Sequence, residues 1–378
     1  MKVFKAWLKG EMSNDSREKS GLGGLTLHLE DEFRGSPLAA SLSRSLQPHP
    51  LAPIGPADYP SFGRRDLLVT RHRGEFIKPC PGTLNYNCCG LSIFHFGLGC
   101  TIGCRYCILT AYLGTEALVL FGNISEGVEE LALTLAKPAG TRPLRYCTGE
   151  FTDSLLLDRK SSLAARLISM FSAAPAATLE LKTKTDNIYH LLGLDHRGGT
   201  VISFSVNAPE VCRKEEGGAA RLESRLKAAK AAAEAGYHIG LHFDPLIFHP
   251  DWEAAYGETV DMIGDYLHSA EVAWVSLGCF RYLPNLKELM LDKFPETTIY
   301  NGEFIRGGDG KMRYPRPLRT KMYQYLAARL RPVLPSEAVI YMCMESPRVW
   351  RDVFGHDPQT EGLTAMLDRR VMSLRALA

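Results

Sequence analysis

Two kinds of segment are missing from this chain of 378 residues. No apolar run approaches the ~20 residues that a membrane-spanning helix needs, and the first residues, MKVFKAWLKGEMSNDSREKSG, contain no apolar core of signal-peptide length. Charge of one sign is not in excess either, since the formal net charge is +2. We therefore expect a cytoplasmic protein without a membrane partner, in which ten cysteines favour metal or redox chemistry over disulfides.

The N-terminal part lacks a sustained hydrophobic period. Residues 1–60 are rich in Ser, Pro, Ala and Gly, which predicts an extended or poorly ordered segment. Residues 61–90 form a turn-rich lead-in that contains Cys80, Cys88 and Cys89. Burial of these thiols as small apolar residues is favoured over a second metal site, because the side chains of adjacent cysteines diverge.

A regular alternation of β-rich and helical segments begins near residue 91. Strands are predicted at 91–98, 143–151, 179–185, 201–207, 238–247 and 272–280, and helices at 125–140, 154–174, 219–238 and 251–270. This alternation is typical of parallel βα units, so we predict an α/β fold with a partial (β/α)6 TIM-type barrel over 91–290. The C-terminal region, 291–378, would add a basic hairpin and helices. Catalysis should occur at the carboxyl ends of the strands.

Three cysteines follow the first predicted strand. Cys100, Cys104 and Cys107 lie in GCTIGCRYC, where one loop can present several soft thiolate ligands to one centre. An iron–sulfur cubane has four corners, so three cysteines leave one iron open to another ligand. The alternative is a structural zinc site, completed by Cys88, Cys89 or a histidine.

The spacing of these cysteines resembles the cluster motif of the radical S-adenosylmethionine superfamily, and further stretches resemble its spore photoproduct lyase family. The stretches are GCTIGCRYCILTAYLG, GEFTDSLLLD, LKTKTDNIYHLL, FSVNAPEV, AGYHIGLHFDPLI and DGKMRYPRPLR. The resemblance implies a [4Fe–4S] cluster that cleaves S-adenosylmethionine to a 5′-deoxyadenosyl radical, with a flavodoxin or ferredoxin as electron donor. It also implies repair of a thymine dimer in ultraviolet-damaged DNA.

The same resemblance assigns individual residues. It implies cluster ligation by Cys100, Cys104 and Cys107, and contact of an aromatic residue, Tyr106, with the cofactor. The Thr-Asp run that contains Asp153 matches a Ser-Asp run of the family. The remaining residues implied to bind the cofactor are Lys184 at its carboxylate and Ser205 and Asn207 near its ribose.

One departure from the family concerns hydrogen return. The position of the lyase's hydrogen-donor cysteine falls on Glu150, and Gly149-Glu150 resembles the Gly-Glu pair with which many radical S-adenosylmethionine enzymes bind the cofactor's ammonium group. Cys147 and Cys279 end predicted strands and are the alternative donors, with Tyr106 as a possible relay. Cys147 would need a bulge to face the site, because it lies an odd number of residues from Glu150.

A basic segment follows the barrel. Between residues 306 and 331 eight Lys or Arg residues face one acid, Asp309, and tyrosines are interleaved. Such a hairpin could contact a phosphate backbone, or it could be a solvated cationic surface. The predicted nucleic-acid contacts are Lys311, Arg313, Tyr314, Arg316 and Arg319.

Three functions follow from these patterns. The first is a DNA-repair lyase of the photoproduct type, and the second is a radical S-adenosylmethionine enzyme with another nucleic-acid, nucleotide or peptide substrate. The third is a non-enzymatic zinc module. The replaced cysteine favours the second, and the basic segment favours nucleic acid.

Overall fold

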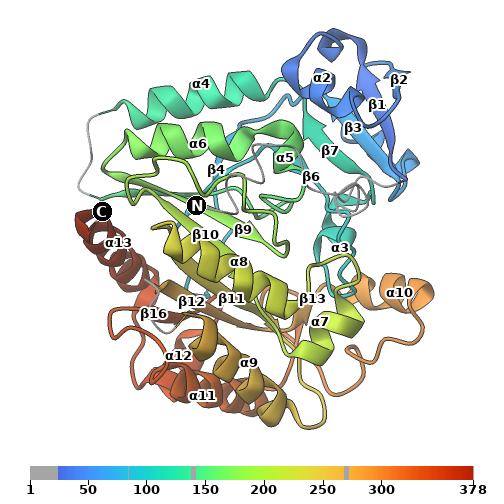
Figure 1. Ribbon diagram of the computed structural model, residues 1–378. Helices are drawn as coiled ribbons and strands as arrows, with labels where there is room; N and C mark the ends of the chain where they lie inside the picture. The colour runs from blue at the N-terminus through green and yellow to red at the C-terminus, as the bar shows by residue number, and fades with distance from the viewer. Residues whose placement is uncertain (1–23, 84, 138–141, 268–271, 378) are drawn as a thin grey trace.

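The computed structural model describes residues 24–83, 85–137, 142–267 and 272–377 (Figure 1). Its main element is an eight-stranded sheet in the spatial order β16-β12-β11-β10-β9-β8-β5-β4. All neighbouring strands are parallel except β4, which runs antiparallel to β5. The strands are β4 (Ile77–Pro79), β5 (Ser92–Phe94), β8 (Leu144–Cys147), β9 (Ala177–Thr183), β10 (Thr200–Ser205), β11 (His238–Leu246), β12 (Val272–Cys279) and β16 (Val339–Met342).

This sheet contains all six predicted barrel strands. They were recognisable because parallel strands covered on both faces have near-continuous apolar runs; every residue of β12, for example, is buried. The seventh parallel strand, β16, was not predicted, since its four residues are too few to show a period. It adds the sequence VIYM to the end of the half-barrel.

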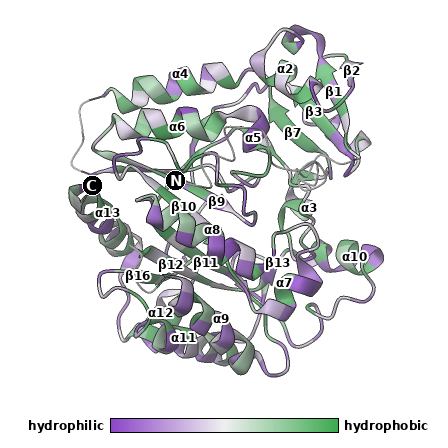
Figure 2. Cartoon of the chain, viewed as in Figure 1, coloured by the Kyte–Doolittle hydropathy of each residue, from purple (hydrophilic) through white to green (hydrophobic). Residues whose placement is uncertain are grey.

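Helices lie along the outside of the curved sheet (Figure 1). Each mixes hydrophobic and hydrophilic residues (Figure 2), as expected for helices that bury one face. In α8 the buried residues Leu222, Leu226 and Ala229 recur at helical spacing against β10 and β11. The helices are α4 (Ile124–Leu135), α5 (Asp158–Ser161), α6 (Leu163–Ser172), α7 (Pro209–Glu215), α8 (Leu222–Glu234), α9 (Trp252–Leu267), α10 (Pro284–Lys293), α11 (Arg316–Leu330), α12 (Pro347–Phe354) and α13 (Gln359–Leu377).

The N-terminal region forms a second sheet, in the order β2-β1-β3-β7-β6. The prediction of a poorly ordered segment over 1–60 is therefore wrong for residues 24–60, whereas residues 1–23 lie outside the described part. Its strands are short and separated by Pro- and Gly-rich turns, so no period is visible in the sequence. The elements are β1 (Thr26–Glu30), η3 (Asp31–Phe33), α2 (Pro37–Ser43), β2 (Pro48–Leu51), η4 (Tyr59–Ser61), β3 (Asp66–Thr70), β6 (Gly97–Leu98) and β7 (Leu118–Phe121).

The chain crosses between the two sheets immediately before the cysteines. Strand β5 belongs to the main sheet, and β6, which starts three residues after it, pairs with β7 of the second sheet. The loop with the three cysteines follows β6, and α3 (Leu109–Leu113) follows the loop. The cysteine loop is therefore held where the two sheets meet.

A third, three-stranded sheet has the order β13-β15-β14. Strands β14 (Ile305–Arg306) and β15 (Met312–Arg313) are antiparallel and form the predicted hairpin around GGDG, while β13 (Arg281–Tyr282) continues the chain from β12. The basic residues from Arg316 to Arg329 belong to α11 instead, and Arg331 directly follows it. Among the described residues, no helix is long and apolar enough to cross a bilayer.

Candidate active site

The cysteine loop is fixed by close backbone contacts. Gly99 has a φ of 80°, and a Cβ there would lie 2.4 Å from the carbonyl oxygen of Ala117, so only glycine fits. The Arg105 N–H donates to the Glu215 carbonyl at 2.8 Å, and the Gly218 N–H donates to the Ile102 carbonyl at 2.8 Å. The residues after α7 therefore hold the loop in place.

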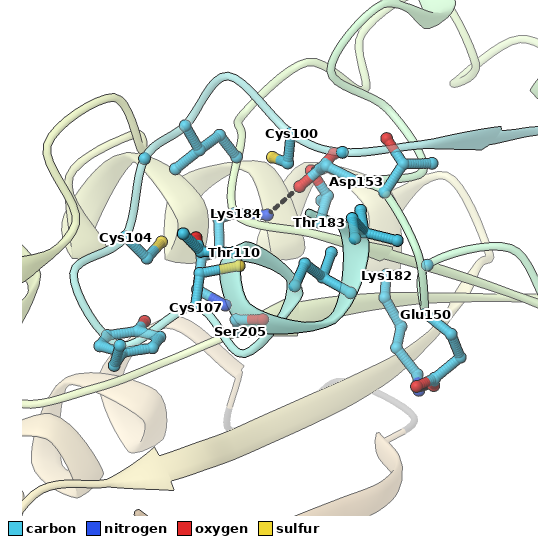
Figure 3. A pocket seen from close by; sticks show the side chains of 18 of the residues that line it. Cys100, Cys104, Cys107, Thr110, Glu150, Asp153, Lys182, Thr183, Lys184 and Ser205 are labelled. Carbon is cyan, nitrogen blue, oxygen red and sulfur yellow. Dashed lines mark hydrogen bonds and ion pairs between the residues drawn. The ribbon is translucent and has the colours of Figure 1, made fainter. Parts of the chain in front are cut away.

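All three motif cysteines line one cavity of about 230 Å³ at the carboxyl ends of the strands. Figure 3 shows the side chains of Cys100, Cys104 and Cys107 around the space that Lys184, Asp153 and Ser205 also face. Burial raises the pKa of each thiol, that of Cys104 to about 12, although the Lys184 ammonium acts in the opposite direction on Cys104 and Cys107. Binding of a metal would therefore displace protons from these sulfurs.

The arrangement of these thiols distinguishes between metals. Within the described residues, no three Cys, His, Asp or Glu side chains converge as a single metal ion requires. A tetrahedral zinc site needs such convergence. A cubane cluster binds each thiolate to a different iron, so its ligands surround a volume rather than a point. Three thiols of one loop around one cavity are the donor set that a cluster with one open corner would need.

Asp153 joins the ends of β8 and β9 beside Cys100. Its Oδ1 accepts hydrogen bonds from the Thr183 hydroxyl at 2.8 Å and the Leu155 N–H at 2.9 Å, and its Oδ2 accepts one from the Lys184 N–H at 2.7 Å (Figure 3). Burial raises the pKa of Asp153. Asp153 fixes the start of the Lys184 segment, and its Oδ2 retains capacity to accept another hydrogen bond from the cavity.

Lys184 and Tyr106 meet on the cysteine side of the cavity. The Lys184 ammonium lies 5.7 Å from the centre of the Tyr106 ring. Burial alone would lower the pKa of Lys184, but nearby Cys104 and Glu216 outweigh it and raise that pKa. The Tyr106 hydroxyl donates to Glu216, whose carboxylate also pairs with Arg225. The buried Glu216–Arg225 pair, missed in the sequence, orients Tyr106.

Glu150 has a partner that sequence reasoning missed. Its carboxylate forms an ion pair with Lys182, and Figure 3 shows both side chains directed away from the cysteines. Gly149 permits this approach of β8 to β9, because a Cβ on it would lie 2.6 Å from the Lys182 Cβ. The position of Lys182, two residues before Lys184 at the end of β9, was the available signal.

Two further ionisable residues, His242 and Asp244, line the cavity next to this pair. His242 Nε2 lies 2.8 Å from Glu180 Oε1, and Asp244 pairs with Arg281 at 3.0 Å. Glu180 also accepts hydrogen bonds from Ser203 and Trp274. Burial alone would raise the pKa of Glu180, but Lys182, His242 and the Ser203 hydrogen bond outweigh it and hold that pKa below the usual range. His242 and Asp244 end β11 in HFDP, so their strand-end position could have identified them.

The other predicted site residues are divided between the cavity and the core. Ser205 lines the cavity. Asn207 does not: it is buried, and its side-chain amide donates to the Pro245 carbonyl at 2.8 Å and accepts from the Tyr256 hydroxyl at 2.6 Å. Cys147 and Cys279 are buried and are also absent from the cavity lining. No bulge brings Cys147 into the cavity; its sulfur accepts the Gly149 N–H at 3.3 Å.

The predicted nucleic-acid residues are mostly internal. Arg313 is buried and pairs with Asp309, and Arg319 is buried and pairs with Glu345. The hydroxyl of buried Tyr314 accepts the Phe248 N–H at 3.1 Å. Arg313 and Arg319 are therefore not part of a solvated cationic surface, because each is buried in an ion pair, one within the hairpin and one with the stretch after β16. The remaining two are buried Lys311, 3.7 Å from Asp309, and partly exposed Arg316, paired with Asp352.

The three cysteines of the lead-in lie close together. The pKa of Cys88 is raised, with hydrogen bonding to Cys80 as the largest cause, and Cys89 is also in contact with Cys88. Cys89 is buried, and the other two are partly exposed. As for the motif cysteines, no single-ion geometry forms here among the described residues.

A parallel half-barrel that presents three cysteines of one loop to a cavity at the carboxyl ends of its strands defines the radical S-adenosylmethionine class of enzyme. The family model for spore photoproduct lyase matches residues 91–343. The chain belongs to the spore photoproduct lyase family.

Curated relatives and solved structures agree with this assignment. The spore photoproduct lyase of a Geobacillus species is 27% identical over 249 residues, covering 61% of this chain and 71% of that enzyme. That of Bacillus subtilis is 25% identical over 260 residues, covering 65% and 74%. A solved spore photoproduct lyase complexed with dinucleoside spore photoproduct superposes with a TM-score of 0.73 at 20% identity, covering 85% of this chain and 99% of that one. A mutant lyase with bound AdoMet and the same dinucleoside has a TM-score of 0.73, which supports the fold.

Proposed function

We propose that this protein is a radical S-adenosylmethionine lyase that repairs a thymine photoproduct in ultraviolet-damaged DNA. The observation that carries the proposal is the cavity in which Cys100, Cys104 and Cys107 face Lys184 and Asp153 at the mouth of the half-barrel. Its support is membership in a family whose solved members bind dinucleoside spore photoproduct and AdoMet.

The cysteines would hold a [4Fe–4S] cluster, and its open iron would bind the methionine end of S-adenosylmethionine. When bound and reduced, this pair supplies a 5′-deoxyadenosyl radical that can take a hydrogen atom from a substrate. A flavodoxin- or ferredoxin-type protein is the proposed electron donor.

Two residues beside the cysteines are proposed to hold the methionine end of the cofactor. The Lys184 ammonium, next to Cys104, would pair with the carboxylate. The free acceptor capacity of Asp153, next to Cys100, suits the ammonium group. This assignment differs from that made from the sequence, because the Glu150 carboxylate is engaged by Lys182. Ser205 lines the cavity and is the proposed ribose contact.

One observation favours a second candidate function. The position of the family's donor cysteine carries Glu150, in an ion pair, rather than a thiol. This favours a radical S-adenosylmethionine enzyme that acts on another damaged or modified nucleotide.

The test is anaerobic reconstitution with iron and sulfide, followed by incubation with S-adenosylmethionine, a reductant and irradiated DNA. A brown protein that releases 5′-deoxyadenosine and restores thymine supports the lyase function. Release of 5′-deoxyadenosine without restored thymine would indicate the second function. A Cys100→Ala/Cys104→Ala/Cys107→Ala variant should be colourless, and full iron retention in it would contradict the cluster assignment.

A further inference from the structure

One hydrogen-bonding atom in the wall of the cavity has no partner. His242 lines the cavity that the three motif cysteines also line, and only 10% of its side chain is exposed. Its Nε2 lies 2.8 Å from Glu180 Oε1, whereas its Nδ1 has no hydrogen-bond partner within the described residues and is not enclosed by protein. Because buried polar groups are normally hydrogen-bonded, Nδ1 is placed to bind a group that enters the cavity.

The surroundings of Glu180 determine which ring nitrogen of His242 carries the hydrogen. Glu180 Oε1 also accepts from the Ser203 hydroxyl at 2.6 Å and from the Trp274 indole N–H at 2.9 Å. Gly240 leaves the space for these contacts, since a Cβ on it would lie 2.1 Å from the Ser203 hydroxyl oxygen and 2.9 Å from Trp274 Nε1. Glu180, whose pKa is held low, is ionised and can only accept, so Nε2 carries the hydrogen. In the neutral imidazole Nδ1 is therefore an acceptor.

The neighbouring ionisable side chains that line the cavity are engaged in ion pairs. Glu150 pairs with Lys182, and Asp244 pairs with Arg281 at 3.0 Å. These four residues carry no net charge, and each cation already has an acid as its partner. A phosphate would be recognised by cations that are free to bind it. The group that suits the His242 acceptor is therefore a neutral N–H donor rather than an anion.

We propose that His242 is a substrate-binding residue whose Nδ1 accepts a hydrogen bond from a ring N–H of the nucleobase. The proposal rests on the proposed radical function at the same cavity. A thymine-type ring in DNA has a single N–H, which lies between two carbonyl oxygens. The Lys182 ammonium also lines the cavity and has N–H groups beyond the one that Glu150 uses, so it can donate to a carbonyl oxygen of the same ring. The contact with His242 would fix which edge of the base faces the wall.

The test compares two probes, dinucleoside spore photoproduct and the same compound methylated at both ring N–H groups. Equilibrium dialysis measures their binding to anaerobically reconstituted protein with S-adenosylmethionine and without reductant, so that no turnover occurs. Wild type should bind the unmethylated probe about three- to tenfold more tightly, the effect of one hydrogen bond. This comparison requires no substitution in the protein, so a folding defect cannot affect it.

Variants then assign the preference to His242. His242→Leu removes the acceptor, so the preference for the unmethylated probe should fall below about twofold. His242→Asn provides an amide oxygen near the position of Nδ1 and should retain part of the preference. His190→Leu is the matched control, because Nε2 of His190 lies 2.7 Å from the buried Asp158 carboxylate but His190 is not part of the cavity lining. This control should bind both probes as wild type does.

Three results would overturn the proposal. Equal binding of the two probes by wild type means that no ring N–H is recognised. A wild-type preference in folded His242→Leu means that another residue accepts the hydrogen bond, and a lost preference in His190→Leu means that the effect is not specific to the cavity. A different result refutes the proposed lyase function, and the His242 contact with it: wild type that retains S-adenosylmethionine but binds neither probe.

Discussion

The Glu150 carboxylate and the Lys182 ammonium form an ion pair across the neighbouring parallel strands β8 and β9. The motif comparison made from the sequence places the donor cysteine of lyases of this family at Glu150. Burial alone would lower the pKa of Lys182, but the acidic groups around it, Cys147, Glu150 and Glu180, outweigh it and keep that pKa well above its usual value. The lysine therefore remains charged, and Glu150 is held away from the cysteines.

The first prediction is that Asp153, and not Glu150, contributes to binding of the cofactor. Asp153→Asn should weaken S-adenosylmethionine binding by about tenfold or more, because a charge-assisted hydrogen bond contributes roughly 1.5–3 kcal/mol. Glu150→Gln should change the dissociation constant by less than about twofold, since its partner is Lys182. Equilibrium dialysis with reconstituted protein measures both. The reverse order of effects would restore the assignment made from the sequence.

The second prediction concerns the close approach of β8 to β9. Gly149→Ala would place a Cβ 2.6 Å from the Lys182 Cβ and 3.1 Å from the Ser154 hydroxyl. Overpacking of this kind costs about 1–3 kcal/mol in the free energy of unfolding. Gly193→Ala is the control, because nothing lies within 4 Å of its added Cβ. Urea denaturation of both variants checks this, and equal stabilities would contradict it.

The third prediction separates an exposed arginine from a buried one in the C-terminal region. Arg306, on β14, is exposed. Its replacement by Ala should weaken DNA binding and lower the slope of log affinity against log salt concentration by about one, without changing stability. Arg319→Ala leaves buried Glu345 without its ion-pair partner and should cost about 3–5 kcal/mol in stability. Fluorescence anisotropy over a salt series and denaturation measure the two effects. Weakened DNA binding by Arg319→Ala alone would revive the predicted phosphate contact.

The fourth prediction is a loss of stability in acid that depends on His95. Burial lowers the pKa of His95 to about 3, and nearby His72 adds to the effect. In the unfolded chain the imidazole takes up a proton near pH 6.5, so between about pH 6.5 and 3 the unfolded state binds the extra proton. The free energy of unfolding should therefore fall as pH falls, by about 1.4 kcal/mol per pH unit from this group.

Replacement of His95 by Phe should flatten that acid dependence. The ring already packs against Phe121 and Phe151, so an aromatic side chain fits the site. Urea denaturation at several pH values between 7 and 4 measures the slope, with His356→Asn at an exposed position as the control. Parallel profiles for wild type and His95→Phe would refute the prediction.

The sequence predicted those features that depend on local pattern. The six barrel strands have long apolar runs, and the cysteine spacing is a property of one loop, so both were found. Strand β16 was too short to be recognised. Lys182 was overlooked because no motif contains it, although its spacing from Lys184 places both on one face.

The ion pairs could not be predicted from the sequence for a different reason. Arg319 was taken for a free cation because its ion pair depends on which distant residue the fold brings near, whereas Asp309, the partner of Arg313, lies in the same hairpin. The acid that pairs with Arg319, Glu345, lies 26 positions away in the stretch after β16. Likewise, the second sheet forms from residues whose partners in β7 lie about 50 positions later in the chain.

The position of β7 in the second sheet determines how much of the chain a catalytically active fragment must contain. This strand pairs with β3 on one side and with β6, directly before the cysteines, on the other. The segment shared with the family model begins at residue 91 and so excludes β3. A fragment starting there would expose the backbone groups along one edge of β7, a surface prone to pairing with other chains. Domain swaps and truncations intended to preserve the thiols should therefore retain residues 24–70 as part of the catalytic unit.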